Sequence, residues 1–438
     1  MNVISLIPTL TSSKYPLAFR SVLDNIDDQQ WDSISSTFSE NSSGIIIVTT
    51  TAQSVANLCS SHMYNMRTLE DGHSEEFLKS VLFESSRNLS MFEGSLKLIV
   101  NKCDGHPLAL GSMATYLLRG NKFTKEDFCN FWDRLCDKMK ECPEFRDLEQ
   151  ILMNNYCRLP GYPLNVRACL LYICAFPGGH PIRRNRLIRR WLAEGYSQEE
   201  ANESFKKLVD QNIFRTIGSS KSMEEKTCIA HGIIHGFMKH MSKTTRFMES
   251  ANNSERRNYR HLYKNDGELD MCQSHNSENN NSEEFHAHSL TICGREGKKV
   301  IGDLPKCKVL RVLDLEECDD LENADIENID KLWHLKYLSL GPNIDKLLEK
   351  IDMLHCLEML DLRKTKIDTI PVEVIKLHHL PHLLGKFKLE KRDWEKRKVD
   401  TFFKKESNLE TLAGFVTDGN PGFLMLMAHM KKLNKVKI

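Results

Sequence analysis

The chain has 438 residues, which is too many for one compact core and indicates about three domains. Hydrophobic residues make up 40% of the chain and charged residues 27%, with a mean hydropathy of −0.42, so a largely disordered protein is excluded. Lys and Arg number 60, as do Asp and Glu, so the chain as a whole has no basic field that would attract nucleic acid or an anionic membrane.

The sequence also indicates a compartment. No apolar run approaches the ~20 residues that a membrane-spanning helix needs, and the first residues lack the basic segment of a secretory signal. The 14 cysteines are scattered without a C-x-x-C pair, which is typical of reduced thiols and not of a disulfide framework. We therefore expect the protein in the cytoplasm or the nucleus.

The first 66 residues predict a single strand–helix–strand unit. Gly44–Thr50 is a continuous, mostly β-branched run, which suits a parallel strand buried on both faces. Ala18–Leu23 is a weaker strand that ends at Asp24, and Asp28–Phe38 can form the helix between the two strands. One such unit is only part of a sheet, so we expect a remnant of an α/β domain.

Helices are predicted next, as a bundle over residues 67–157 and a second domain over residues 158–245. The segment Asp104–Pro107 breaks the chain before an apolar helix, Leu108–Leu118. In the second domain the helix Ile182–Glu194 has one apolar stripe, formed by Leu187, Ile188, Trp191 and Leu192. We therefore expect Trp191 in the core. Five arginines of the same helix are interpreted as its solvated face, and DNA binding is the alternative; they are Arg183, Arg184, Arg186, Arg189 and Arg190.

Residues 246–299 are predicted to be a polar linker, because residues 246–284 are rich in Asn, Ser and Glu. A repeat then follows over residues 300–438. The pattern L-x-x-L-x-L begins at Leu310, recurs 25 and then 22 residues later, and has worn copies at Leu380 and Leu409. This period and pattern indicate leucine-rich repeats, whose strands place Leu313, Leu338 and Leu360 inside a solenoid.

Several stretches, in this order, resemble the plant disease-resistance receptors that join an NB-ARC nucleotide switch to leucine-rich repeats. Leu23–Ile26 is similar to the Walker B segment, and Gly44–Thr50 with Val55–Ala56 to the sensor strand. The family's G-L-P-L-A element, its winged helix of the non-TIR type and its M-H-D motif are matched by Cys103–Leu110, by Cys169–Tyr172, Phe176–Pro177 and Leu187–Gly195, and by Cys228–Gly232.

The resemblance implies a multidomain fold with a partial NB-ARC module, made of an incomplete parallel α/β sheet, a helical bundle and a winged helix, followed by a leucine-rich repeat solenoid. It implies an intracellular immune receptor of the coiled-coil type that holds ADP at rest and exchanges it for ATP when a pathogen effector is sensed. The partner of the repeats would be an effector, another protein or a full-length receptor. The nucleotide contacts that it implies are Pro107, His231 and Asp24.

The departures from the family pattern concern the phosphates of the nucleotide. The sequence contains no G-x-x-x-x-G-K-[ST] loop, whose backbone amides and lysine bind phosphate. Asn25 stands where a second Walker B carboxylate is expected, Thr51 where an arginine is expected, and Gly232 where the M-H-D aspartate is expected. We therefore expect an N-terminally truncated receptor that binds nucleotide weakly and has no ATPase activity.

Simpler interpretations exist for each candidate residue. Asp24 can cap a strand end, Pro107 can start a helix, and His231 with His235 forms a zinc pair only if further ligands join them. Two alternative functions also stay open. One is a nucleotide-independent interaction module, such as a decoy or a modulator of a full-length receptor, and the other is a residual gene fragment without function.

Overall fold

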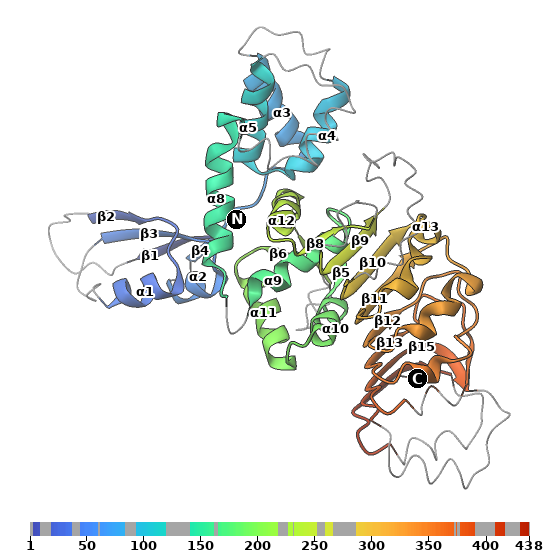
Figure 1. Ribbon diagram of the computed structural model, residues 1–438. Helices are drawn as coiled ribbons and strands as arrows, with labels where there is room; N and C mark the ends of the chain where they lie inside the picture. The colour runs from blue at the N-terminus through green and yellow to red at the C-terminus, as the bar shows by residue number, and fades with distance from the viewer. Residues whose placement is uncertain are drawn as a thin grey trace. The chain divides into compact units, whose positions relative to one another are not determined.

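The computed structural model describes most of the chain, and its elements fall into two compact units (Figure 1). The first unit contains residues 1–170, 178–184 and 199–240, and the second contains residues 171–177, 185–198 and 241–438. The described residues are 3–8, 19–36, 44–59, 62–83, 93–119, 141–161, 165–217, 227–230, 232–251, 259–265, 286–371, 374, 377–389, 408–416 and 430–437.

The first unit begins with a four-stranded sheet. Its order is β2 (Phe19–Leu23), β3 (Gly44–Thr50), β1 (Val3–Pro8) and β4 (His62–Asn65). Strands β2 and β3 are parallel, as predicted, whereas β1 runs antiparallel to both β3 and β4. The predicted parallel pair is thus present, and β1 is an additional antiparallel strand that was not among the predicted elements.

Two helices pack beside this sheet. Helix α1 (Asp28–Ser35) connects β2 to β3 and begins with a capping box, in which Asp27 and Gln30 bond each other's backbone N–H groups. Helix α2 (Gln53–Cys59) follows β3. Trp31 of α1 and Val55 of α2 are buried with Val48 of β3 in one hydrophobic cluster, so the predicted strand–helix–strand unit is confirmed.

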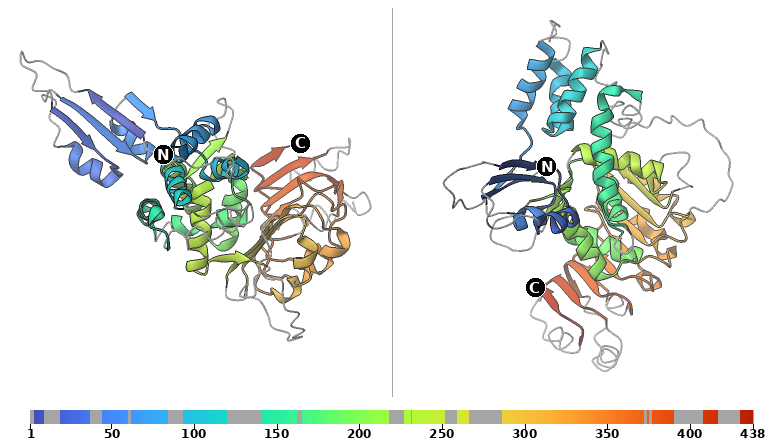
Figure 2. Two further views of the ribbon diagram at one scale, coloured as in Figure 1. Left: turned by 90° about the horizontal axis from the view of Figure 1, so that it is seen from above. Right: turned by 90° about the vertical axis from the view of Figure 1, so that its left-hand side faces the viewer.

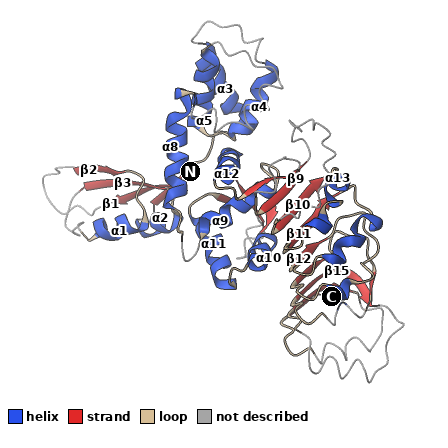
Figure 3. Cartoon of the chain, viewed as in Figure 1, coloured by secondary structure: helices blue, strands red, loops and turns tan. Residues whose placement is uncertain are grey.

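The rest of the first unit is mostly helical (Figure 3). The bundle helices are α3 (Asp71–Phe83), α4 (Glu93–Cys103), α5 (Pro107–Leu118), α8 (Arg146–Arg158) and α9 (Val166–Leu171). A small antiparallel sheet follows, in the order β5 (Ile182–Arg183), β7 (Thr227–Ala230) and β6 (Phe214–Ile217), with helices α11 (Gln198–Asp210) and α12 (Gly232–Thr244). A short three-stranded sheet with helices is the arrangement of a winged helix.

The second unit is built on a long parallel sheet, seen from two further sides in Figure 2. In sheet order its strands are β8 (Met248–Ser250), β9 (His261–Asn265), β10 (Ser289–Gly294), β11 (Val312–Cys318), β12 (Tyr337–Ser339), β13 (Met359–Asp361), β15 (His382–Leu389), β16 (Thr411–Phe415) and β17 (Lys435–Lys437). Strand β14 (Thr369–Ile370) pairs with β15 beside this path. Short helical segments connect the strands, among them α13 (Gly297–Ile301), η6 (Asn323–Lys331) and η7 (Ile351–Met353).

The leucines of the repeat form a ladder inside this solenoid. Leu313 pairs with Leu338, and Leu338 pairs with Leu360 in the next strand. All three are 0% exposed and belong to one hydrophobic cluster that runs through the repeats. The predicted register is therefore confirmed.

The predicted linker over residues 246–299 is corrected by the structure. Strands β8, β9 and β10 lie within it and extend the parallel sheet of the repeats toward the N-terminus. The polar residues that suggested a linker partly occupy buried positions, since His261 and Lys264 of β9 are each 1% exposed. Residues 266–285 lie outside the described part of the chain.

We predict that Leu338→Ala lowers the free energy of unfolding by about 2–5 kcal/mol, because it leaves a cavity in the leucine ladder. Trp333→Ala is the control, since Trp333 lies in the turn before the same strand and is 64% exposed. The control should change stability by less than about 0.5 kcal/mol. Urea unfolding followed by circular dichroism measures both, and equal losses would contradict the register.

Candidate functional site

Asp24 lies at the end of β2 and is exposed. Its carboxylate accepts a hydrogen bond from Thr49 Oγ1, and Thr49 Oγ1 accepts one from the backbone N–H of Asn25 at 2.8 Å. Asn25 has a φ of 54°, a left-handed conformation that asparagine adopts more readily than most residues. These two hydrogen bonds hold the end of β2, at Asp24, to Thr49 of β3.

Pro107 begins α5, directly after a sharp turn. His106 caps the helix, because its Nδ1 accepts a hydrogen bond from the N–H of Ala109 at 3.4 Å. In the turn, Gly105 has a φ of +68°, and a Cβ at this position would lie 2.0 Å from the carbonyl oxygen of Leu69. The Gly105 carbonyl in turn accepts a hydrogen bond from Leu69 N–H at 2.9 Å. Only glycine fits this close approach without a shift of the backbone.

Pro107 also lines a pocket of about 410 Å³ within the first unit. Its wall comes from the turn before α5, from α8, from the segment after β4, from β6 and β7, and from the start of α12. Thr51 lines it too, but Asp24 does not, and His231 lies outside the described residues. Of the three predicted nucleotide contacts, the described structure therefore places only Pro107 in this pocket.

The pocket fits one part of a nucleotide better than the other. Its wall is mostly apolar, which suits a planar base, but no lysine is among the residues that line it. The Thr51 hydroxyl lies 3.3 Å from Gln211 Oε1, and the Thr51 carbonyl oxygen accepts a 2.7 Å hydrogen bond from Asn212 Nδ2. Both polar groups of Thr51 are thus bonded to neighbouring side chains, and the cationic side chains among the residues that line the pocket are Arg67 and Arg215.

A second candidate site lies in the other unit, where α10 (Arg184–Glu194) contacts the open face of the repeat sheet. Arg186 binds the carboxylate of Asp314 in β11 through two nitrogens, at 2.8 and 2.9 Å. Arg190 donates to the same carboxylate at 2.9 Å. The Phe176 ring packs under both guanidinium groups, 4.7 Å from Arg186 Cζ and 5.1 Å from Arg190 Cζ.

This contact is buried, which corrects the prediction of a solvated arginine face for Arg186 and Arg190, while Arg183, Arg184 and Arg189 are half-buried. Arg186 is 3% exposed, and Arg190 and Asp314 are each 0% exposed. Desolvation by burial acts to raise the pKa of Asp314, but the attraction of Arg186 and Arg190 outweighs it and holds the pKa below its usual value. Trp191 is also 0% exposed, so its predicted place in the core is confirmed.

The other end of α10 contacts the first strands of the same sheet. Glu194 Oε1 lies 3.5 Å from His261 Nδ1, and Glu194 Oε2 lies 3.8 Å from His288 Nδ1. Burial lowers the pKa of His261 to about 3, so its imidazole is neutral at neutral pH. Ala193 of α10 packs in one hydrophobic cluster with apolar side chains of the repeat strands, which are Val312, Tyr337, Met359 and Leu384.

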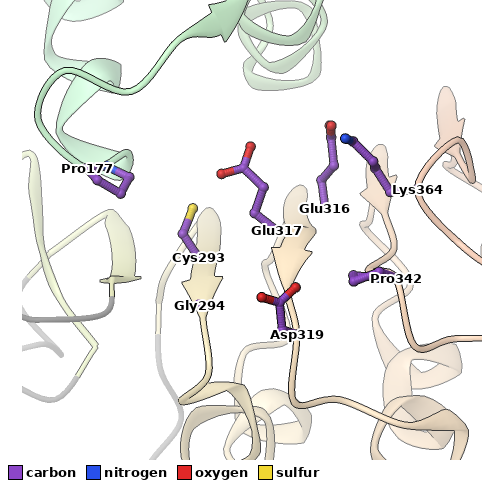
Figure 4. A pocket seen from close by; sticks show the side chains of 8 residues that line it. All are labelled: Pro177, Cys293, Gly294, Glu316, Glu317, Asp319, Pro342 and Lys364. Atoms are coloured by element: carbon purple, nitrogen blue, oxygen red, sulfur yellow. The ribbon is translucent and has the colours of Figure 1, made fainter.

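A hollow of about 420 Å³ adjoins this contact within the second unit (Figure 4). Glu316, Glu317 and Lys364 are among the side chains that line it (Figure 4). Glu317 also pairs with Arg186. In the described part of the chain, no group of three His, Cys, Asp or Glu side chains is arranged to hold a metal ion.

Two family models match the chain. Residues 175–238 match the disease resistance protein winged helix domain, and residues 286–438 match a leucine-rich repeat region. Two rice (Oryza sativa subsp. japonica) proteins, both named disease resistance protein RGA4, are 39% identical over 436 residues. That alignment covers 95% of this chain and 42% or 43% of the rice proteins. The chain is a plant disease resistance protein relative.

Other rice relatives agree with this assignment. Disease resistance protein Pik-2 is 28% identical over 412 residues, which cover 84% of this chain and 38% of Pik-2. The chain thus spans less than half the length of these disease resistance proteins. No helix among its described residues is long and apolar enough to cross a membrane.

In this disease resistance protein relative, the turn before α5 should tolerate no side chain. Gly105→Ala is expected to lower the free energy of unfolding by about 1–3 kcal/mol, because it strains a left-handed residue against Leu69. Gly111→Ala is the matched control, since Gly111 lies inside α5 and a Cβ there meets nothing within 4 Å. The control should gain about 0.5–1 kcal/mol from helix propensity. Thermal unfolding compares the two, and a stable Gly105→Ala protein would contradict the turn geometry.

Proposed function

We propose that this chain is the regulatory part of a plant immune receptor of the NB-ARC leucine-rich repeat type, acting in the cytoplasm or the nucleus. Its repeats bind a pathogen effector, another protein or a full-length receptor, and it is a switch component and not an enzyme. The observation that carries the proposal is the contact of Arg186 and Arg190 with Asp314. This contact ties a helix of the winged-helix domain to the repeats, so a partner that engages the repeats can act on that helix.

The alternative function is an interaction module that works without nucleotide. It is favoured by the pocket beside Pro107, whose described lining includes no lysine, and by the bond of Asp24 to Thr49. A decoy or modulator of a full-length receptor would need only the repeats and their contact with α10. The two functions differ in whether nucleotide controls the chain.

The experiment is to edit the gene in the plant. A null allele should lose resistance to at least one isolate of a pathogen panel. Asp314→Asn should raise defence-marker expression without a pathogen, because it removes the carboxylate that the buried Arg186 and Arg190 share, and breaking a buried ion pair costs about 3–5 kcal/mol. Full resistance in the null plants across the panel would overturn the immune role.

Asp361→Asn is the matched control for the regulatory contact. Asp361 lies two strands from Asp314 at the same register position, but it pairs with Arg363 of its own repeat. Plants with this allele should keep a resting defence level and normal protein abundance. If both alleles behaved alike, the effect would come from loss of the repeats and not from release of α10.

We further predict that the 438-residue chain binds ADP and Mg-ATP weakly and does not hydrolyse ATP. Charge-assisted hydrogen bonds are each worth about 1.5–3 kcal/mol, so losing three phosphate contacts removes roughly 5–9 kcal/mol. That is about three to seven powers of ten in affinity. Calorimetric titration measures this, with Thr51→Arg as a variant expected to gain affinity. A dissociation constant near or below a micromolar would favour the nucleotide switch.

A further inference from the structure

We propose that the turns leading into the repeat strands bind an acidic segment of a partner protein. A large apolar side chain of this segment packs on Trp333, and its carboxylates lie against histidines and lysines on both sides. The surface lies wholly within the second unit, and the inference rests on the proposed function only in that the repeats bind a protein.

The same turn precedes five of the repeat strands. In each turn the backbone N–H of the fourth residue donates to the carbonyl oxygen of the first, at 3.0 to 3.2 Å. The first and fourth residues belong to the hydrophobic cluster of the repeats or pack against it. The two middle residues are exposed or half-buried. We call these five turns the turn ridge; they are residues 307–310, 332–335, 354–357, 377–380 and 430–433.

The turns stack from one repeat to the next. The first four end two residues before one row of paired strand residues, which are Val312, Tyr337, Met359 and His382. Farther along, Asn408 Nδ2 donates to the carbonyl oxygen of His378, and Lys432 Nζ donates to Asn408 Oδ1 at 2.6 Å. Neighbouring strands lie about 4.8 Å apart, so the steps from β11 to β17 make the turn ridge roughly 24 Å long.

The middle positions of the turn ridge carry hydrogen-bond donors and no carboxylate. Asp and Glu number 60 in the chain, but none of them is a middle residue of these turns. An imidazole keeps at least one N–H donor in either protonation state, and a lysine ammonium has three donors. A carboxylate can therefore accept hydrogen bonds along the ridge. The histidines are His334, His355, His378 and His379, and the lysines are Lys308, Lys431 and Lys432.

Carboxylates do lie beside the turns. Three of them are within two residues of a turn, and they are Asp330, Asp352 and Glu358. Glu358 is paired with Lys336 at 2.7 Å, and Asp330 is half-buried. Asp352 is therefore the one that is exposed and can repel an acidic segment.

Trp333 gives the turn ridge an apolar anchor. It is 64% exposed, and Met353, directly before the next turn, is 41% exposed. Tryptophan is enriched among the residues that dominate the binding energy of interfaces, because its ring combines a large apolar area with an N–H donor. The lysines lie at the two ends of the ridge, before β11 and β17. The matching segment has an apolar side chain at its centre and carboxylates on both sides.

The spacing of the lysines favours a protein segment over a nucleic acid. A nucleic acid carries a phosphate about every 3.4 Å along each strand, and its affinity depends on neutralising many of them. The lysines of the turn ridge are confined to its ends, with histidines between them. A segment with a few carboxylates needs no denser row of cations.

A random peptide library tests this preference. Phage that display short random peptides are selected on the folded 438-residue chain. The buffer contains EDTA, so that metal ions do not bridge histidines. The enriched peptides should be rich in Asp and Glu and contain an aromatic or large aliphatic residue. Enrichment of basic or uncharged peptides, or of none, would overturn the proposal.

Apolar variants locate the binding. The best peptide is synthesised with a fluorescent label, and its affinity is measured by anisotropy. Trp333→Ala, an exposed position that should leave the fold intact, is expected to weaken binding at least about tenfold. Leu58→Ala is the matched control, since Leu58 is 65% exposed but lies in the first unit, and it should change nothing. Equal affinity for the unaltered chain and Trp333→Ala would overturn the proposal.

Charge variants test the acidic character of the segment. Lys431→Glu should weaken the same peptide about two- to fivefold, and Asp352→Asn should strengthen it. Lys346→Glu, an exposed lysine between β12 and β13, is the control and should have no effect. An effect of Lys346→Glu as large as that of Lys431→Glu would mean general attraction to net charge and overturn the proposal.

A labelled single-stranded oligonucleotide is titrated in parallel. Tighter binding of the oligonucleotide than of the peptide would assign the turn ridge to nucleic acid and overturn the proposal. All of these measurements use the purified chain. Full resistance in null plants would therefore count against the immune role and not against the turn ridge.

Discussion

One buried carboxylate joins two parts of the second unit that lie 128 residues apart in sequence. Asp314 receives Arg186 and Arg190, which stand one helical turn apart and therefore share a face of α10. Burying these charges, with Glu316 3.4 Å from Arg186, costs desolvation free energy that only close geometry offsets, so few placements of the helix on the sheet are tolerable. The bidentate bond of Arg186 to Asp314 and the Phe176 ring below both arginines further restrict the position of α10. The contact thus specifies a position more than it adds stability.

The packing of α10 also reduces the solvent exposure of one face of the repeat sheet. In a bare solenoid, side chains such as Tyr337 and Met359 would face solvent and be available to partners. Here they pack around Ala193 of α10, and Tyr337 is 1% exposed. A partner of this face must therefore bind elsewhere on the repeats or displace the helix. At these positions α10, and not solvent, covers this face of the repeat sheet.

Prediction from the sequence succeeded where structure is periodic and failed where it depends on distant partners. The leucine ladder could be predicted because Leu313, Leu338 and Leu360 repeat a local pattern that a solenoid must bury. The arginines of α10 seemed solvated because their partner Asp314 lies in a strand that no local pattern links to them. Strands β9 and β10 seemed a linker because residues such as His261, polar in sequence, are covered in the fold. Pro107 could be placed at a helix start, but the pocket beside it is assembled from remote segments.

The antiparallel strand β1 has a consequence for the order in which the first unit forms. Val3 pairs with Thr50 on one side and with Asn65 on the other, so β1 becomes a central strand although it precedes every other strand. Pairings of such long sequence separation form late, because the loop between them must close first. During synthesis, β1 leaves the ribosome before either neighbour exists. The pairing of β2 with β3, which α1 joins, closes a shorter loop than the pairing of β1 with β3 and therefore costs less chain entropy.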